Sequence, residues 1–138
     1  MSTRPVILLV EDVDEHRQLV RLSIEKTFAC DVLEARDGVE GAVLAVEHPP
    51  DVIVTDLDMP RMGGVEFIAF IRRCPATSGI PIVVLTLRDA TRDGIDVSAF
   101  GILACLRKPF RPQQLRDALT AAGWSARSGG GEPAVDET

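Results

Sequence analysis

At 138 residues the chain has the length of one domain, and its 46% hydrophobic and 26% charged residues are typical of a soluble globular protein. The net charge of -6 argues against a nucleic-acid-binding surface, which would need a clustered basic face. No apolar stretch approaches the ~20 residues that cross a bilayer, and no charged-then-apolar leader is present, so we expect a cytoplasmic protein without nucleic-acid or membrane partners. The odd number of widely spaced cysteines favours reduced, buried thiols over disulfides.

Short β-type runs alternate with helical patterns along the chain, which predicts parallel βαβ units with helices on both faces of a central sheet. The run around Val32 is the least apolar, so we expect it at an edge of the sheet. The strands are expected at Val6–Val10, around Val32–Ala35, at Val52–Thr55, at Ile82–Leu85 and at Ala104–Leu106.

Two helices are expected in the first half of the chain. The first should begin at a cap formed by Asp14 and run to about Phe28. The second should open on a capping box formed by Asp37 and Glu40, and end before Pro49. The residues expected to face inward are Leu19, Val20, Leu22 and Ile24 on the first helix, and Val39, Ala42, Val43 and Val46 on the second.

Three more helices are expected in the second half. One should start near Gly64, one should span about 90–100, and one should have Pro112 in its first turn and end at Gly123. The helix over 90–100 contains Gly94 and few apolar residues, so its stability should be low. The inward-facing residues are expected to be Val65, Phe67, Ile68 and Ile71, and then Leu115, Ala118 and Leu119.

The pattern predicts one domain over residues 1–124. The Gly-rich segment 125–138 has too little apolar surface to offset the entropy of ordering it, so we expect a disordered tail.

Polar residues follow four of the five predicted strands. Glu11 and Asp12 follow the first, Asp56 the third, Thr86 the fourth and Lys108 the fifth. Parallel strand ends of one sense lie at one edge of a sheet, so these side chains should converge on one site. Three carboxylates brought together repel one another or recruit a cation, and oxygen-only ligands at a shallow edge favour Mg²⁺. With a hydroxyl and an ammonium added, the group suits phosphoryl transfer.

Four motifs in this order resemble the receiver domain of bacterial two-component response regulators. They are Leu8–Asp12, Thr55–Gly64, Val84–Thr86 and Lys108–Phe110, and the resemblance covers about residues 5–122. Each motif alone is weak, but all four together are highly specific.

The resemblance implies a flavodoxin-like, doubly wound five-stranded parallel sheet of order 2-1-3-4-5 with five helices. By the same resemblance, Asp56 would accept a phosphoryl group from a phosphohistidine on a histidine kinase or a phosphotransfer protein. Lys108 would pair with the phosphoryl oxygens and precede a cis peptide bond to Pro109. Thr86 would hydrogen-bond the phosphoryl group and report its presence to the far face of the last two strands.

The resemblance also implies a Mg²⁺ site. Asp12 would bind the ion directly and Glu11 mainly through water, and Asp56 and the backbone carbonyl of Asp58 would complete the protein ligands. We expect a stand-alone module, monomeric or weakly dimeric, that signals by contact with a downstream protein. It would catalyse only its own aspartyl phosphorylation and dephosphorylation.

Two alternatives remain open. Asp56 and Asp58 after an apolar strand also resemble the first motif of haloacid-dehalogenase-type phosphatases, although no acid follows Lys108 until Asp117. A receiver-like module that docks without phosphate is the other alternative.

This chain departs from the family pattern in having Leu87 directly after Thr86, where a small residue is usual. It also has Cys105 three residues before the lysine, where an aromatic residue is common.

Overall fold

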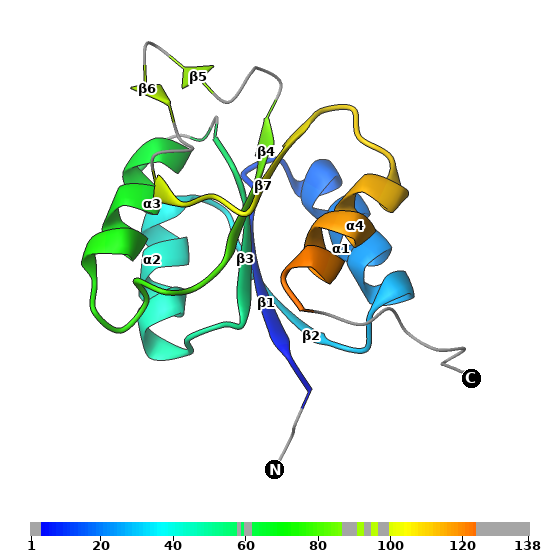
Figure 1. Cartoon of the computed structure of the whole chain (residues 1–138), viewed down its shortest axis with the longest axis horizontal. Helices are drawn as coiled ribbons and strands as arrows, with labels where there is room; N and C mark the ends of the chain where they lie inside the picture. Colours follow the sequence, from blue (N-terminus) through cyan, green and yellow to red (C-terminus); the bar gives the residue numbers. More distant parts are fainter. Residues whose placement is uncertain are drawn as a thin grey trace.

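A five-stranded parallel sheet forms the centre of the computed structural model, which describes residues 4–57, 59, 62–86, 91–92, 95–96 and 100–123. The strands lie in the order β2-β1-β3-β4-β7, which confirms the predicted order 2-1-3-4-5 (Figure 1). Their bounds are β1 Val6–Val10, β2 Asp31–Ala35, β3 Val52–Asp56, β4 Ile82–Thr86 and β7 Ala104–Arg107. The predicted doubly wound α/β class is therefore confirmed.

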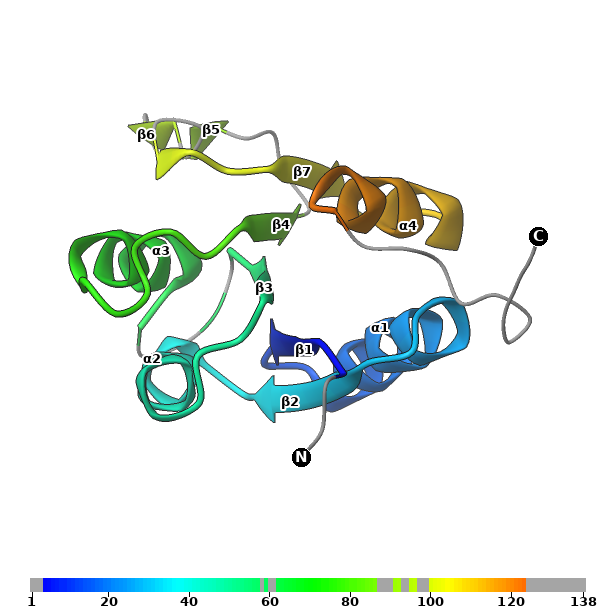
Figure 2. The same cartoon turned by 60° about the horizontal axis from the view of Figure 1, so that its bottom comes forward.

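Helices cover both faces of this sheet, as Figures 1 and 2 show. The helices α1 (Asp14–Thr27) and α4 (Pro112–Ala121) lie on one face, and α2 (Gly38–Glu47) and α3 (Gly64–Arg73) lie on the other. Alternate residues of each strand point to opposite faces and build two cores. Ile7 and Leu9 of β1 join the core under α1 and α4, whereas Leu8 and Val10 join the core under α2 and α3.

The central strands β3 and β4 position the polar residues at their ends. All residues of β3 and β4 are buried, as expected for strands covered by helices on both faces. The β2 strand lies at one edge and is mostly half-buried, which confirms the prediction from its weaker apolar run. The β7 strand forms the other edge, with alternating half-buried and exposed residues. A rigid central strand therefore ends at Asp56.

The buried face of α1 differs from the prediction. Val20 and Ile24 are buried as expected, but Leu19 and Leu22 are 64% and 51% exposed. The inward line continues one turn further, to the buried Phe28, because residues four apart share a helix face. Asp14 also does not cap this helix. Val13 occupies the N-cap position without a side-chain hydrogen bond, and Asp14 is the first helical residue.

The buried face of α2 was predicted only in part, since Ala42 is buried as expected but the three valines are not. The helix buries its small residues Gly38, Gly41, Ala42 and Ala45 and leaves Val39, Val43 and Val46 40%, 50% and 43% exposed. It packs too closely for larger side chains, since a Cβ atom on Gly41 would lie 3.0 Å from Val10 Cγ2 and 3.1 Å from Phe67 Cε1.

The cap of α2 is close to the predicted capping box. The Asp37 carboxylate accepts a hydrogen bond from the Glu40 amide at 2.9 Å, as predicted. The Glu40 carboxylate accepts from the Arg36 amide at 2.6 Å, one residue before the expected position.

The helices α3 and α4 largely follow the prediction. Phe67, Ile68 and Ile71 are buried on α3, whereas Val65 is only half-buried. Pro112 lies in the first turn of α4, and Gly123 beyond its end has a φ of +96°. On α4 the three residues predicted to face inward, Leu115, Ala118 and Leu119, are all buried.

The described part of the chain contains four helices, not the five predicted. Within the segment 90–100, four of the described residues form two short antiparallel strands, β5 (Thr91–Arg92) and β6 (Ile95–Asp96). Gly94 lowers the helix propensity of this segment, which agrees with the low helix stability predicted for it. The predicted tail, and Leu87 beside Thr86, lie outside the described residues.

None of the three cysteines is in a disulfide, as predicted, but only Cys30 is buried, while Cys74 is half-buried and Cys105 exposed. None of the helices in the described ranges is long and apolar enough to span a membrane.

Candidate functional site

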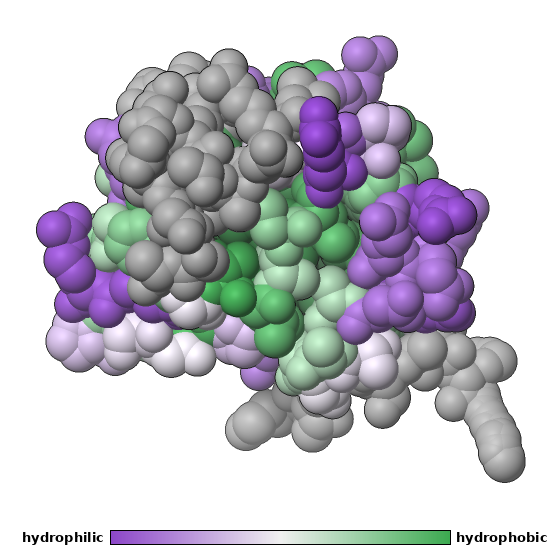
Figure 3. Space-filling model, turned by 45° about the horizontal axis from the view of Figure 1, so that its top comes forward, coloured by the Kyte–Doolittle hydropathy of each residue, from purple (hydrophilic) through white to green (hydrophobic). Residues whose placement is uncertain are grey.

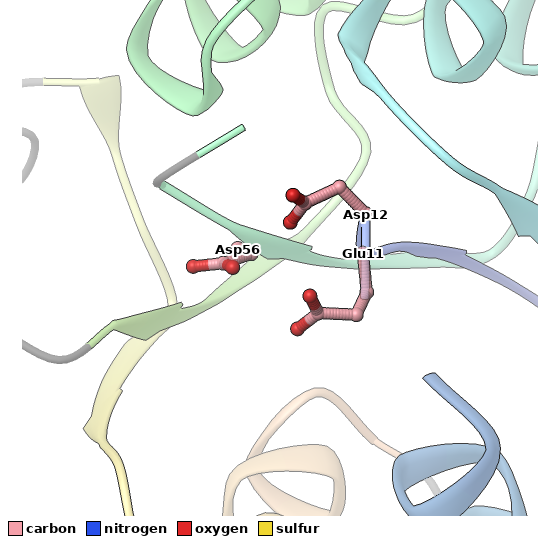
Figure 4. Close-up of side chains that lie close together, drawn as sticks. All are labelled: Glu11, Asp12 and Asp56. Atoms are coloured by element: carbon pink, nitrogen blue, oxygen red, sulfur yellow. The ribbon is translucent and has the colours of Figure 1, made fainter. Parts of the chain in front are cut away.

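Residues from three strand ends meet at the carboxyl edge of the sheet, as predicted. The Lys108 ammonium donates to Glu11 Oε1 at 2.8 Å and lies 3.4 Å from Asp56 Oδ2. Each of Glu11, Asp12 and Asp56 offers a carboxylate oxygen within 4.8 Å of the others (Figure 4). Glu11 and Asp56 are far apart in the sequence but close in space, because β1 and β3 are neighbours in the sheet.

Thr86 ends β4 at the same edge. It is fully buried and stands opposite Arg107 in the register of β7. Its carbonyl accepts a hydrogen bond from the Lys108 amide at 2.6 Å, which connects the two strand ends directly. The next peptide bond, between Lys108 and Pro109, is cis, as predicted. The backbone of Asp58, predicted as a further ligand, lies outside the described residues.

Asp56 is held by close packing of α3 against its backbone. Its side chain is 7% exposed, so it is reachable only from the site itself. A Cβ atom on Gly64 would lie 2.4 Å from both the Asp56 carbonyl oxygen and Leu57 Cα. Only glycine permits this approach, which brings the Gly64 amide to 3.0 Å from the Leu57 carbonyl oxygen. The sequence predicts only that a helix starts near Gly64, so its close contact with the end of β3 was missed, although the glycine pair at 63 and 64 could have suggested it.

Glu11 and Lys108 form a buried ion pair beside Asp56. The Glu11 side chain is 0% exposed, and its second oxygen accepts a hydrogen bond from the Val13 amide at 3.1 Å. Burial alone would lower the pKa of Lys108, but the hydrogen bond to Glu11 and the negative charges of Asp56 and Glu11 together raise it. Lys108 therefore stays a cation in the site.

The carboxylate trio fits a hard divalent cation. Burial and the nearby charge of Glu11 raise the pKa of Asp12, which is the electrostatic cost of gathering these acids. A divalent cation would relieve that repulsion, and a donor set made only of carboxylate oxygens suits a hard ion rather than zinc or copper.

An apolar groove opens beside Lys108, between α1 and the segment that joins β7 to α4. Its volume is about 380 Å³, and its walls include Leu19, Val20, Pro109 and Phe110. Sequence reasoning missed this groove because Leu19 was assigned to the core. The exposed position of Leu19 is what builds the wall.

The phosphatase alternative finds no support in the geometry. Asp117, the first acid after Lys108, is exposed on α4 and accepts a hydrogen bond from Gln113 at 3.1 Å. The acid that completes the trio is Glu11, which that mechanism does not use.

Comparisons with known proteins agree on one family. The response regulator receiver domain matches residues 7–120. The chain is 33% identical over 111 residues to RpaA, a DNA-binding dual master transcriptional regulator of Synechocystis, covering 80% of this chain but only 46% of that protein. It is 30% identical over 114 residues to a chemotaxis protein CheY homolog of Campylobacter jejuni, covering 82% of this chain and 88% of that one.

A solved structure gives the same result. The chemotaxis response regulator CheY4 of Vibrio cholerae superimposes with a TM-score of 0.78 at 31% identity, over 87% of this chain and 99% of that one. The chain therefore belongs to the response regulator receiver domain family of two-component signal transduction systems.

Proposed function

We propose that Asp56 is the phosphoacceptor of this receiver domain. The observation that carries the proposal is the position of the Lys108 ammonium, which lies 3.4 Å from Asp56 and 2.8 Å from Glu11 at the mouth of the carboxylate trio. An anion bound to Asp56 would contact the Lys108 ammonium directly, and charge-assisted hydrogen bonds of this kind are short and strong.

The donor is a phosphohistidine on a histidine kinase or a phosphotransfer protein. One carboxylate oxygen of Asp56 attacks phosphorus, the P–N bond breaks, and its electron pair stays on the imidazole, leaving an acyl phosphate on Asp56. Lys108 pairs with the phosphoryl oxygens as charge builds on them, and the Thr86 hydroxyl donates to one of them.

Glu11, Asp12 and Asp56 hold Mg²⁺ in this proposal, with the backbone carbonyl of Asp58 as a further ligand. When bound, the ion neutralises charge on the transferring group. The trio carries three negative charges against the single charge of Lys108, so the site is poised to take up a divalent cation before a phosphoryl group.

The donor protein docks in the apolar groove beside Lys108. Leu19 projects there with 64% of its surface exposed, and Pro109 and Phe110 form the opposite wall. An apolar side chain on a donor helix could bury itself in this groove while its histidine reaches Asp56.

The output is contact with a downstream protein. Figure 3 shows apolar surface in the middle of one face, in the region of β7, with hydrophilic side chains to its right where α4 lies. Leu103 is 36% exposed and Cys105 is also exposed there. The edge strand β7 pairs with β4 at Thr86, so a conformational change at the site can reach the exposed edge through a single pair of strands.

Labelling with acetyl phosphate tests the assignment. We expect Mg²⁺-dependent incorporation of one phosphoryl group per chain, and none in Asp56→Asn. Asp117→Asn is the matched control, because it removes an exposed acid on α4 and should be labelled like the wild type. Sustained hydrolysis of p-nitrophenyl phosphate would favour the phosphatase, and Mg²⁺-independent labelling, or labelling that survives in Asp56→Asn, would refute the assignment.

A further inference from the structure

Arg17, near the start of α1, binds three separate acceptors with one guanidinium. It donates from Nη1 to the Glu11 carbonyl oxygen at 2.9 Å, from Nε to Glu34 Oε1 at 2.9 Å, and from Nη2 to Asp14 Oδ1 at 2.5 Å. Its side chain is only 12% exposed. The three acceptors lie on the loop after β1, on the edge strand β2 and on the first helical turn, so this side chain joins three elements.

The contact with Glu11 bears on the carboxylate trio. The Glu11 amide donates to the Ala35 carbonyl of β2 at 3.0 Å, and the Glu11 carbonyl accepts from Arg17, which is itself held by Glu34 of β2. Both peptide groups of Glu11 are thereby attached to β2. The second of them leads into Asp12, so its orientation determines where the Asp12 carboxylate points.

Figure 4 shows the consequence of that orientation. Glu11 and Asp12 are consecutive residues, yet both carboxylates extend toward the space beside Asp56. Neighbouring side chains in extended backbone point to opposite sides, and the chain bends at Asp12, shortly after the end of β1. Resting on the proposed function, we propose that Arg17 is a positioning residue of the cation site, holding the Glu11–Asp12 peptide so that Asp12 faces Asp56.

Arg21 separates this role from a simple tether between α1 and β2. It lies one turn further along α1, pairs with Glu34 through its Nη1, and pairs with Glu25 at 3.1 Å. The attachment of α1 to Glu34 is thus made twice. What Arg17 adds is the hydrogen bond to the Glu11 carbonyl and the contact with Asp14.

The alternative explanations predict effects of opposite sign. If Arg17 acted only through its positive charge, Arg17→Ala would remove a repulsive charge and tighten binding of a cation at the trio. If Arg17 orients the loop, Arg17→Ala weakens binding. Arg17→Lys keeps the charge but presents one compact ammonium in place of the planar fork, so it should also weaken binding.

The experiment measures the affinity for Mg²⁺ alone by isothermal titration calorimetry, without any phosphodonor. We expect the Kd to rise about tenfold in Arg17→Ala and Arg17→Lys, the lower end of the range for residues that orient metal ligands. Arg21→Ala is the matched control and should bind Mg²⁺ like the wild type. In the metal-free state, amide hydrogen exchange at Val13 should be faster in Arg17→Lys, because that amide donates to Glu11 Oε2.

The outcomes separate this inference from the proposed function. A wild-type chain that binds no Mg²⁺ would refute the proposed cation site and this inference with it. A wild-type chain that binds Mg²⁺, with an Arg17→Lys variant that binds it as tightly, would overturn the role of Arg17 alone. A rise of the same size in Arg21→Ala would also overturn it, because loss of the α1–β2 tether would then suffice. If Arg17→Ala does not fold, the Arg17→Lys result decides.

Discussion

Replacing Gly64 by alanine should damage both stability and phosphorylation. The added Cβ would lie 2.4 Å from the Asp56 carbonyl oxygen and from Leu57 Cα, whereas ordinary contacts begin at 3.4 Å. Both obstructing atoms belong to the backbone, so relief requires α3 or the end of β3 to move by about 1 Å, the scale of misplacement that can cost a reaction ~100-fold.

The change in stability expected for Gly64→Ala has the opposite sign from the change that helix propensity alone predicts. At an unobstructed helical position, Gly→Ala stabilises by about 1 kcal/mol. Overpacking costs about 1–3 kcal/mol, and the rigid backbone at Gly64 places this site at the upper end, so we expect a net loss of about 2 kcal/mol. Urea unfolding monitored by circular dichroism measures that loss, and the initial rate of acetyl phosphate labelling measures the displacement of Asp56.

Gly63 provides the matched control. A Cβ there would meet its nearest atom, Glu66 Oε1, at 3.5 Å, and the backbone φ of -71° suits alanine. Gly63→Ala should therefore change stability and labelling little. A Gly64→Ala variant that is as stable as Gly63→Ala and is labelled at the wild-type rate would refute the claim that close packing of α3 positions Asp56.

Three further predictions concern the charges and the groove. Because burial and the charge of Glu11 raise the folded-state pKa of Asp12, its carboxylate costs stability as pH rises through that pKa, so at neutral pH without metal Asp12→Asn should be more stable than the wild type. Mg²⁺ at ~100 times its Kd should raise the free energy of unfolding of the wild type by about 2.7 kcal/mol and leave that of Asp12→Asn unchanged. If urea titrations show that Asp12→Asn is still the more stable of the two with Mg²⁺ present, this prediction is contradicted. Lys108→Met should cost about 3 kcal/mol in urea unfolding, because it leaves the buried Glu11 carboxylate without its cation; a loss below ~1 kcal/mol would show that the pair contributes little. Leu19→Glu should slow phosphotransfer at least ~10-fold from whichever histidine kinase labels the wild type, yet change stability by less than ~0.5 kcal/mol and leave acetyl phosphate labelling intact; equal slowing with both donors would argue against a docking role.

Strands, strand ends and some of the local caps could be predicted because they depend on neighbouring residues, although the cap expected at Asp14 does not form. Buried strands need continuous apolar runs, which locates Asp56 at the end of β3. The Asp37 cap and Pro112 in the first turn of α4 also follow from chemistry within a few residues. The convergence of Glu11, Asp56 and Lys108 required only the additional rule that parallel strands end at one edge, and the ion pairs confirm it.

The residues by themselves therefore determined where the strands lie and which polar residues follow them, because hydrophobic periodicity is a local property of the chain, whereas the strand order was implied by the resemblance to receiver domains. Only the tertiary structure decided which helical side faces inward. On α2 the close approach of Val10 and Phe67 to Gly41 selects the small residues for the interior and turns Val43 outward, although hydrophobicity alone favours burying the valine. The same holds for Leu19, whose exposure creates the groove beside Lys108, since packing distance between two elements is encoded in neither sequence segment separately.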